Sequence, residues 1–251
     1  MPRPYVLSIA GFDPSAGAGI LSDVKTFESL DVYGLGVCSA LTYQNDILFD
    51  GIAWIPVENI ISQIEILRKR FDFDFIKIGL IESLQNMSII VDVLKSGNSN
   101  SKIIWDPILE ASAGFEFHKE MDQELIKKIC SSIYLVTPNW MEIKKLTGCK
   151  EEFEGAAQLS KYCNVFLKGG HSKDKNAIDI LISNGSQHRY EQERIIDGSK
   201  HGSGCVLSSA IASELAKGQT LIKACELGKN YVTAFLKSSE GLLGFHNKKL
   251  K

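Results

Sequence analysis

Short runs of hydrophobic residues alternate along the chain with segments in which hydrophobic residues recur every three or four positions. Tyr5–Ala10 is apolar and is followed by Gly11, a combination typical of a buried strand. From Ile20 to about Asp31 the hydrophobic residues recur at helical spacing. The same criteria predict strands at Phe75–Ile78, Lys102–Asp106, Ile133–Val136 and Asn164–Lys168, and helices at Val57–Arg70, Leu84–Lys95, Trp140–Leu146, Ser203–Lys217 and Thr220–Lys237.

This alternation predicts a three-layer α/β/α fold, in which helices cover both faces of a mostly parallel sheet, because each parallel connection needs a crossover. One segment interrupts the alternation. Asp179–Ser183 and His188–Arg194 flank an Asn-Gly dipeptide, which favours an antiparallel hairpin, and we expect it at the sheet edge. No repeat, low-complexity tract or linker divides the chain. We therefore expect one domain over residues 1–251, with a frayed tail at Asn247–Lys251.

Composition and charge narrow the classes of function. Hydrophobic residues make up 44% of the 251 residues and charged ones 23%, which is ordinary for a globular protein. A formal net charge of −2 leaves no basic excess to neutralise a phosphate backbone, so no nucleic acid partner is expected. No long apolar run or cleavage-site pattern indicates a membrane or secreted protein. The six cysteines form no C-x-x-C pair, which argues against zinc or redox motifs and fits the cytoplasm.

Five segments of unusual composition fall mainly at the ends of predicted strands. In open α/β sheets, ligands bind beyond the carboxyl ends of the strands, so these segments are expected to form one cleft. They are Gly11–Gly19, Asp106–Gly114, Thr137–Glu142, Lys168–His171 and the Gly202–Cys205 turn.

The glycine-rich segment Gly11–Gly19 lies where a dinucleotide-binding loop would lie. The G-x-G-x-x-G pattern fails, however, because Ser22 occupies its third position and no acidic residue ends a plausible second strand. What remains is a backbone that can approach a small ligand closely, with Asp23 on the following helix. The alternative is a simple turn with a solvated aspartate.

The run Gly202-Ser203-Gly204-Cys205 opens a helix with several backbone N–H groups unpaired. Such a helix start attracts anions and suits a phosphoryl group during transfer. The same field is expected to lower the pKa of the Cys205 thiol, which could then accept the proton of an attacking hydroxyl. The alternative is a glycine-rich helix start with a buried cysteine.

Five further polar positions could serve a nucleotide or a substrate. Asn139 and Glu142, three apart at a helix start, could hold Mg²⁺ through water, although an N-cap with a glutamate at N3 explains them equally. Lys168, before two glycines, offers a positive charge to phosphates, and Asp106 adds a carboxylate at another strand end. Gln44 can both donate to and accept from a heteroaromatic edge, or serve only as a structural glutamine.

Together the segments resemble the ribokinase-like superfamily and, more narrowly, the hydroxymethylpyrimidine/phosphomethylpyrimidine kinases of thiamine biosynthesis. The resemblance runs nearly end to end and rests on several long motifs in the right order. They are IAGFDPSAGAGILSD, KTFESLDVYG, ALTYQN, IKIGL, WDPIL, TPNWMEIKKLTG, FLKGGH and HGSGCVLSSAIASELAKG.

The resemblance implies ATP-dependent, Mg²⁺-assisted phosphorylation of 4-amino-5-hydroxymethyl-2-methylpyrimidine, then of its monophosphate to the diphosphate, by a homodimer. It assigns roles to matching positions. Gln44 and Asp23 would contact the aminopyrimidine, with Gly11 and Leu80 near it. Cys205 would be catalytic, and the backbone amides of Gly202, Ser203 and Gly204 would form the anion hole. The nucleotide would be bound by Lys168, Gly170, Asn139 and Asp106, and the metal ion by Glu142.

The chain departs from the family pattern at several places. Phe12 stands where a small serine is usual, Leu80 replaces a methionine, and Lys200 replaces a threonine before His201. The C-terminal glycine-rich ending is reduced to Leu243–His246. These changes concern the ring pocket and the neighbourhood of the nucleotide phosphates.

Two other functions remain open at the level of sequence. A pyridoxal/pyridoxine kinase of the same superfamily would act on a pyridine that carries a similar hydroxymethyl group. A ligand-binding or regulatory protein without turnover belongs to a different class. Relative rates on the two alcohols distinguish the first, and binding without ATP consumption would identify the second.

Overall fold

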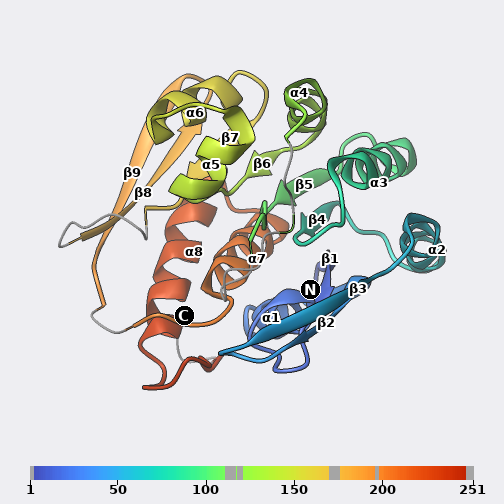
Figure 1. Cartoon of the computed structure of the whole chain (residues 1–251), viewed down its shortest axis with the longest axis horizontal. Helices are drawn as coiled ribbons and strands as arrows, with labels where there is room; N and C mark the ends of the chain where they lie inside the picture. The colour runs from blue at the N-terminus through green and yellow to red at the C-terminus, as the bar shows by residue number, and fades with distance from the viewer. Residues whose placement is uncertain (1–2, 111–116, 118–120, 170–175, 196–197, 247–251) are drawn as a thin grey trace.

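A single mixed β-sheet forms the middle of the molecule in the computed structural model, which describes residues 3–110, 117, 121–169, 176–195 and 198–246 (Figure 1). In these residues nine strands join in the order β3-β2-β1-β4-β5-β6-β7-β8-β9. Their bounds are β1 Tyr5–Phe12, β2 Tyr33–Gln44, β3 Phe49–Trp54, β4 Phe75–Ile78, β5 Lys102–Trp105, β6 Leu135–Val136, β7 Asn164–Leu167, β8 Asn176–Ser183 and β9 Ser186–Glu193.

The centre of the sheet is parallel and both of its edges are antiparallel. Strands β2, β1, β4, β5, β6 and β7 pair in parallel, so the prediction of a mostly parallel sheet is confirmed. The predicted edge hairpin is confirmed as β8–β9, and Asn184 and Gly185 both have positive φ, of 50° and 75°, as its tight turn requires. The expectation of a single antiparallel interruption is wrong, because β2 and β3 form a second antiparallel pair at the opposite edge.

Helices cover both faces of the sheet, so the predicted three-layer α/β/α fold is confirmed (Figure 1). One core cluster packs α2 to α6 against the sheet, and the other packs α1, α7 and α8 against the opposite face. Strand β1 serves both, with Leu7 and Ile9 in the first cluster and Val6 in the second, as alternating side chains require. The helices are α1 Gly19–Ser29, α2 Val57–Arg68, α3 Leu84–Gly97, α4 Gln123–Ser132, α5 Trp140–Thr147, α6 Glu152–Leu159, α7 Ser203–Ala216 and α8 Leu221–Leu236.

Strands β2 and β3 and helices α4 and α6 are elements that the sequence pattern does not predict. In β2, the buried residues Leu35 and Val37 alternate with Gly34 and Gly36. The alternation is typical of a strand, but the glycines resemble turn signals. Gly36 serves packing instead, because a Cβ there would come within 2.8 Å of the Ile20 side chain on α1. The tail predicted to fray lies outside the described residues. Within the described ranges, no helix combines the length and apolarity needed to cross a membrane.

Candidate active site

A cavity of about 680 Å³ lies at the carboxyl ends of the parallel strands. The structure brings most of the predicted site residues to its wall, so the expectation of one cleft is confirmed for the described residues. Gly170 lies outside the residues that the structure describes. The predicted residues that line the cavity are Gly11, Gln44, Leu80, Asp106, Asn139, Glu142, Lys168, Gly202, Ser203, Gly204 and Cys205.

The start of α7 presents free backbone donors to this cavity. Gly202 is its N-cap, with a left-handed φ of 75°, and a side chain there would collide with the Gly17 carbonyl oxygen. The Ser203 N–H donates a long hydrogen bond of 3.3 Å to the Lys200 carbonyl oxygen. The N–H groups of Gly204 and of Cys205 have no hydrogen-bond acceptor in the described part of the chain. With the helix dipole behind them, these donors form an anion-binding site.

Cys205 is a buried thiol at the edge of the same site. Burial raises its pKa to about 11, and the charges of Asp106 and Asp23 act in the same direction. The positive charge of Lys77 and a hydrogen bond from the Gly19 N–H oppose this rise without cancelling it. The expectation of a lowered pKa for Cys205 is therefore wrong, because the loss of hydration on burial outweighs the charge of Lys77 and the hydrogen bond from Gly19.

Beside the start of α7, a lysine bridges two carboxylates. Lys168 Nζ donates to Asp106 Oδ1 at 2.8 Å and lies 3.6 Å from Glu142 Oε2. Burial would raise the pKa of Asp106, but Lys168, Lys77 and a hydrogen bond from Thr137 hold it below its ordinary value. Burial would lower the pKa of Lys168, but the two carboxylates raise it. Lys168 is thus charged, and so is Asp106.

Asn139 and Glu142 form the capping device that was the alternative to a metal site. The Asn139 side-chain oxygen accepts the N–H groups of Met141 and Glu142, and Glu142 Oε2 accepts the Asn139 N–H at 2.7 Å. Both residues nevertheless line the cavity. Because its oxygen is committed to the cap, Asn139 can offer a ligand only its amide nitrogen. Burial raises the pKa of Glu142 to about 7, against the opposing charge of Lys168.

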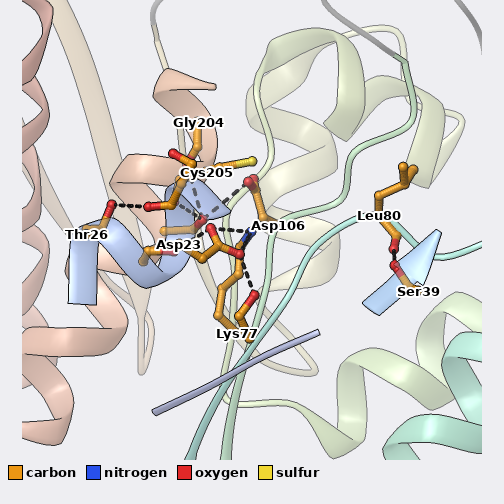
Figure 2. Close-up of polar contacts among 12 residues, drawn as sticks. Asp23, Thr26, Ser39, Lys77, Leu80, Asp106, Gly204 and Cys205 are labelled. Carbon is orange, nitrogen blue, oxygen red and sulfur yellow. Dashed lines mark hydrogen bonds and ion pairs between the residues drawn. The ribbon is translucent and has the colours of Figure 1, made fainter. Parts of the chain in front are cut away.

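The groups predicted to face the ring of a substrate also line the cavity. Gln44 ends β2 and lines the cavity together with Thr42. Gly11 and Leu80 lie against each other, since a Cβ on Gly11 would come within 3.2 Å of Leu80 Cδ2. The Leu80 carbonyl oxygen accepts a hydrogen bond of 2.6 Å from Ser39 Oγ, which fixes this segment (Figure 2).

Comparison with known proteins identifies the family of this chain. The family model described as phosphomethylpyrimidine kinase matches residues 13–248. The chain belongs to the phosphomethylpyrimidine kinase family. It is 33% identical to the hydroxymethylpyrimidine/phosphomethylpyrimidine kinase of Aquifex aeolicus over 247 residues, which cover 94% of this chain and 95% of the relative.

Solved structures of kinases share the fold of this family member. The phosphomethylpyrimidine kinase of Clostridium difficile is 31% identical with a TM-score of 0.78, and the match covers 92% of this chain and 99% of that one. An ADP complex of Bacillus subtilis pyridoxal kinase is 25% identical with a TM-score of 0.83, and the match covers 96% and 94%. The ribokinase-like fold and a kinase activity are thereby shown.

One residue predicted to contact the substrate of this kinase lies elsewhere. Asp23 is fully buried and is absent from the cavity wall as the described residues form it. Its two oxygens accept hydrogen bonds from Ser8, Lys77 and Ser209. This arrangement corrects the expectation that Asp23 contacts the substrate directly.

Two departures from the family pattern fix the segment after α8. Lys200 Nζ donates to the carbonyl oxygens of Ser239 and Gly241 at 2.7 and 2.6 Å, so it ties the segment after α8 to the α7 turn. His246 packs against the rings of Tyr231 and Phe235, in place of a glycine-rich ending. Phe12, by contrast, is partly exposed at the end of β1.

Two polar residues near this site of the kinase, Lys77 and Asp13, are not among the predicted site residues. Lys77 lies in the apolar strand sequence Phe-Ile-Lys-Ile, and that single charge within a buried run was the available signal. Asp13 accepts hydrogen bonds from the Ala18 N–H at 2.8 Å and from His201 Nε2 at 2.9 Å, and so joins the glycine-rich loop to the start of α7. No pattern in the sequence links these two segments.

Proposed function

We propose that this kinase transfers the γ-phosphoryl group of ATP to the hydroxymethyl group of 4-amino-5-hydroxymethyl-2-methylpyrimidine and then to the resulting monophosphate, in thiamine biosynthesis. The observation that carries the proposal is the pair of free amides, at Gly204 and Cys205, which face the same cavity as Lys168. Preorganised donors of this kind stabilise the charge of a phosphoryl group in flight. Membership of the phosphomethylpyrimidine kinase family supports the acceptor.

The acceptor ring is proposed to bind between β2 and the β4–α3 connection. Gln44 offers both an acceptor and a donor, which matches a ring nitrogen beside an exocyclic amino group. Leu80 and the Cα of Gly11 would pack against the ring faces. The hydroxymethyl oxygen would then point toward α7 and Cys205.

The nucleotide is proposed to bind along Lys168, Asp106 and the start of α5. Its phosphates would lie between Lys168 and the α7 amides, and the amide nitrogen of Asn139 would donate to them. The donor set also fits Mg²⁺, because that ion takes one or two carboxylates and completes its shell with phosphates and water. Glu142 would hold the ion, which when bound neutralises charge on the phosphates.

Cys205 is proposed to take the proton of the attacking hydroxyl. With a pKa of about 11, only a small fraction of the thiol is ionised near neutrality, but its thiolate is a strong base. The thiolate would take the hydroxyl proton as the new P–O bond forms, and a stronger base is more efficient in such a step. A strong base that is present in a small fraction therefore suffices.

The structural likeness to Bacillus subtilis pyridoxal kinase favours one second candidate, phosphorylation of pyridoxal. A pyridine with a hydroxymethyl group presents edges similar to those of the pyrimidine. Steady-state rates on the two alcohols decide between them, and a pyridoxal preference of about tenfold, or 1.4 kcal/mol in transition-state binding, would reverse our assignment. Ligand binding with no ATP consumption would instead indicate a protein without turnover.

A homodimer is proposed on the basis of one exposed face. Gln44 points into the cavity, whereas Leu41 and Tyr43, on the other face of β2, are 43% and 55% exposed. Ile47 and Leu48, in the connection to β3, add further exposed apolar surface. Large exposed apolar patches mark protein interfaces. Sedimentation of the purified protein tests the assembly, and a monomer at micromolar concentration would contradict it.

We further propose that the chain is one kinase domain that works in the cytoplasm. The six cysteines are all free, which suits a reducing compartment.

The most informative test of the proposed function is to incubate the protein with ATP, Mg²⁺ and hydroxymethylpyrimidine and to follow the product by mass. Successive gains of one and two phosphoryl groups are expected, and no gain would refute the assignment.

A further inference from the structure

A fully buried ion pair lies beneath the proposed site of transfer. Lys77, in the middle of β4, has no exposed surface, and its Nζ donates to Asp23 Oδ1 and Oδ2 at 3.0 and 2.9 Å (Figure 2). Ser8 Oγ donates to Asp23 at 2.6 Å. Burying two charges in a sheet interior carries a large desolvation cost, and a well-packed apolar pair is often as stable. Stability alone therefore does not explain the pair.

Helix α7 connects this ion pair to Cys205. Ser209 Oγ donates to Asp23 Oδ1 at 2.7 Å, and Ser209 lies four residues after Cys205, on the same face of the helix. Ser208 Oγ lies 3.3 Å from Asp106 Oδ2 and connects α7 to the second buried carboxylate. Figure 2 shows Cys205, Asp106, Asp23 and Lys77 gathered at one place, where α1, α7, β4 and the end of β5 meet.

We propose that Lys77 and Asp23 are positioning residues for phosphoryl transfer, in which the buried ammonium of Lys77 favours the thiolate of Cys205 and Asp23 limits that effect. The inference rests on the proposed function for its catalytic consequence. Lys77 cannot touch a substrate, because it is closed off by Asp23 and by the sheet around it. Its charge acts across low-dielectric protein, where a single charge has a larger effect than in water.

Four charged groups face Cys205 from the surrounding elements. Lys77 on β4 and Lys168 at the end of β7 are positive, whereas Asp23 on α1 and Asp106 after β5 are negative. Among these charges, Lys77 has the largest effect on the pKa of Cys205, and it lowers that pKa. Removing Lys77 and removing Asp23 should therefore change the thiol in opposite directions.

The test measures the alkylation of Cys205 by iodoacetamide as a function of pH, with the modified peptide followed by mass spectrometry because five other cysteines are present. Lys77→Gln should raise the thiol pKa by about one unit and slow alkylation at pH 8 about tenfold, since the thiolate is the reacting form. Asp23→Asn should accelerate alkylation several-fold. Lys229→Gln is the matched control, because Lys229 forms another buried pair, with Asp179 at 2.8 Å, and alkylation of Cys205 should then be unchanged.

A merely structural role predicts a different pattern. If the pair only supports the fold, Lys77→Gln and Asp23→Asn should change alkylation in the same direction, and that result would overturn the proposal. The double variant Lys77→Gln/Asp23→Asn removes both charges without leaving one unpaired, so it keeps the test open if a single variant fails to fold. Its alkylation should be slower than that of the unchanged protein, since the lysine has the larger effect; an equal or faster rate would overturn the proposal.

Catalysis provides the second readout. The kcat of Lys77→Gln should fall about tenfold at pH 7.5 and recover at higher pH, as more of the thiol ionises. A loss of kcat that does not depend on pH would contradict the inference. The alkylation measurement needs no turnover, so failure of the proposed kinase reaction would leave it interpretable.

Discussion

Two helix starts line the same cavity, and they differ in what they do with their backbone donors. At α5, the Asn139 side chain accepts the first free N–H groups and Glu142 completes the capping box. At α7, Gly202 has no side chain to offer, and the N–H groups of Gly204 and Cys205 stay free in the described structure. A capped start stabilises its own helix, whereas an uncapped start can bind an anion. The missing cap, and not the helix start itself, therefore distinguishes the proposed transfer site.

The largest expected effect comes from the side chain at the uncapped start. Cys205→Ala should lower kcat by a factor on the order of 10²–10⁴, the range for loss of a general base, with little change in stability. Single-turnover rates and thermal melts measure the two quantities. An unchanged kcat would remove Cys205 from the mechanism and leave the amides as the whole of the α7 contribution.

The backbone of the same start is tested by Gly202→Ala. The new Cβ would meet the Gly17 carbonyl oxygen and favour a different φ, so the amide cluster should lose its alignment. Loss of a preorganised donor costs about 10²–10³ in kcat. Gly218→Ala is the matched control, since Gly218 also has positive φ, of 89°, but lies at the far end of α7 with open space around its Cα. Equal losses of kcat in both variants would point to general strain.

The pH dependence of kcat separates the two helix starts. Glu142 must be ionised to hold Mg²⁺, so activity should fall as the pH drops below about 7. Cys205 must lose its proton, so activity should rise with pH toward about 11. Glu142→Gln should abolish the acidic limb and leave the alkaline one; persistence of both limbs would exclude Glu142 as their source.

The ring pocket is expected to respond in KM. Gln44→Ala should raise the KM for the pyrimidine by a factor on the order of 10, because one or two hydrogen bonds at about 1 kcal/mol each are lost. The KM for ATP should stay within a factor of about two, since Gln44 is proposed to contact the ring and Lys168 the phosphates. Equal losses for every acceptor alcohol would mean that Gln44 is structural.

The smallest expected effect is at the capped start. Asn139→Ala removes the N-cap of α5 and should destabilise the protein by about 1 kcal/mol, measured by urea unfolding. Its effect on kcat should be below tenfold, because only an amide nitrogen is available to the nucleotide. A loss of kcat as large as that of Gly202→Ala would erase the distinction between the two starts.

The sequence predicted the location of the site better than its electrostatics. Strand ends are local features, so Lys168, Asp106 and the α7 turn were predicted to meet in one cleft, as they do. The pKa of Cys205 depends on how deeply α7 packs on the sheet, and no local pattern reports that depth. Asp23 was misplaced for the same reason, because its partner Lys77 lies 54 residues away. Strand β2 was overlooked because its glycines serve close packing with α1.

The most direct test of the central claim is a crystal structure of the protein with ADP, Mg²⁺, aluminium fluoride and hydroxymethylpyrimidine. The account predicts that the fluoride group accepts hydrogen bonds of about 3 Å from the Gly204 and Cys205 amides, with the pyrimidine oxygen in line. A fluoride group seated at the start of α5, or held by side chains with both α7 amides bonded to protein, would contradict it.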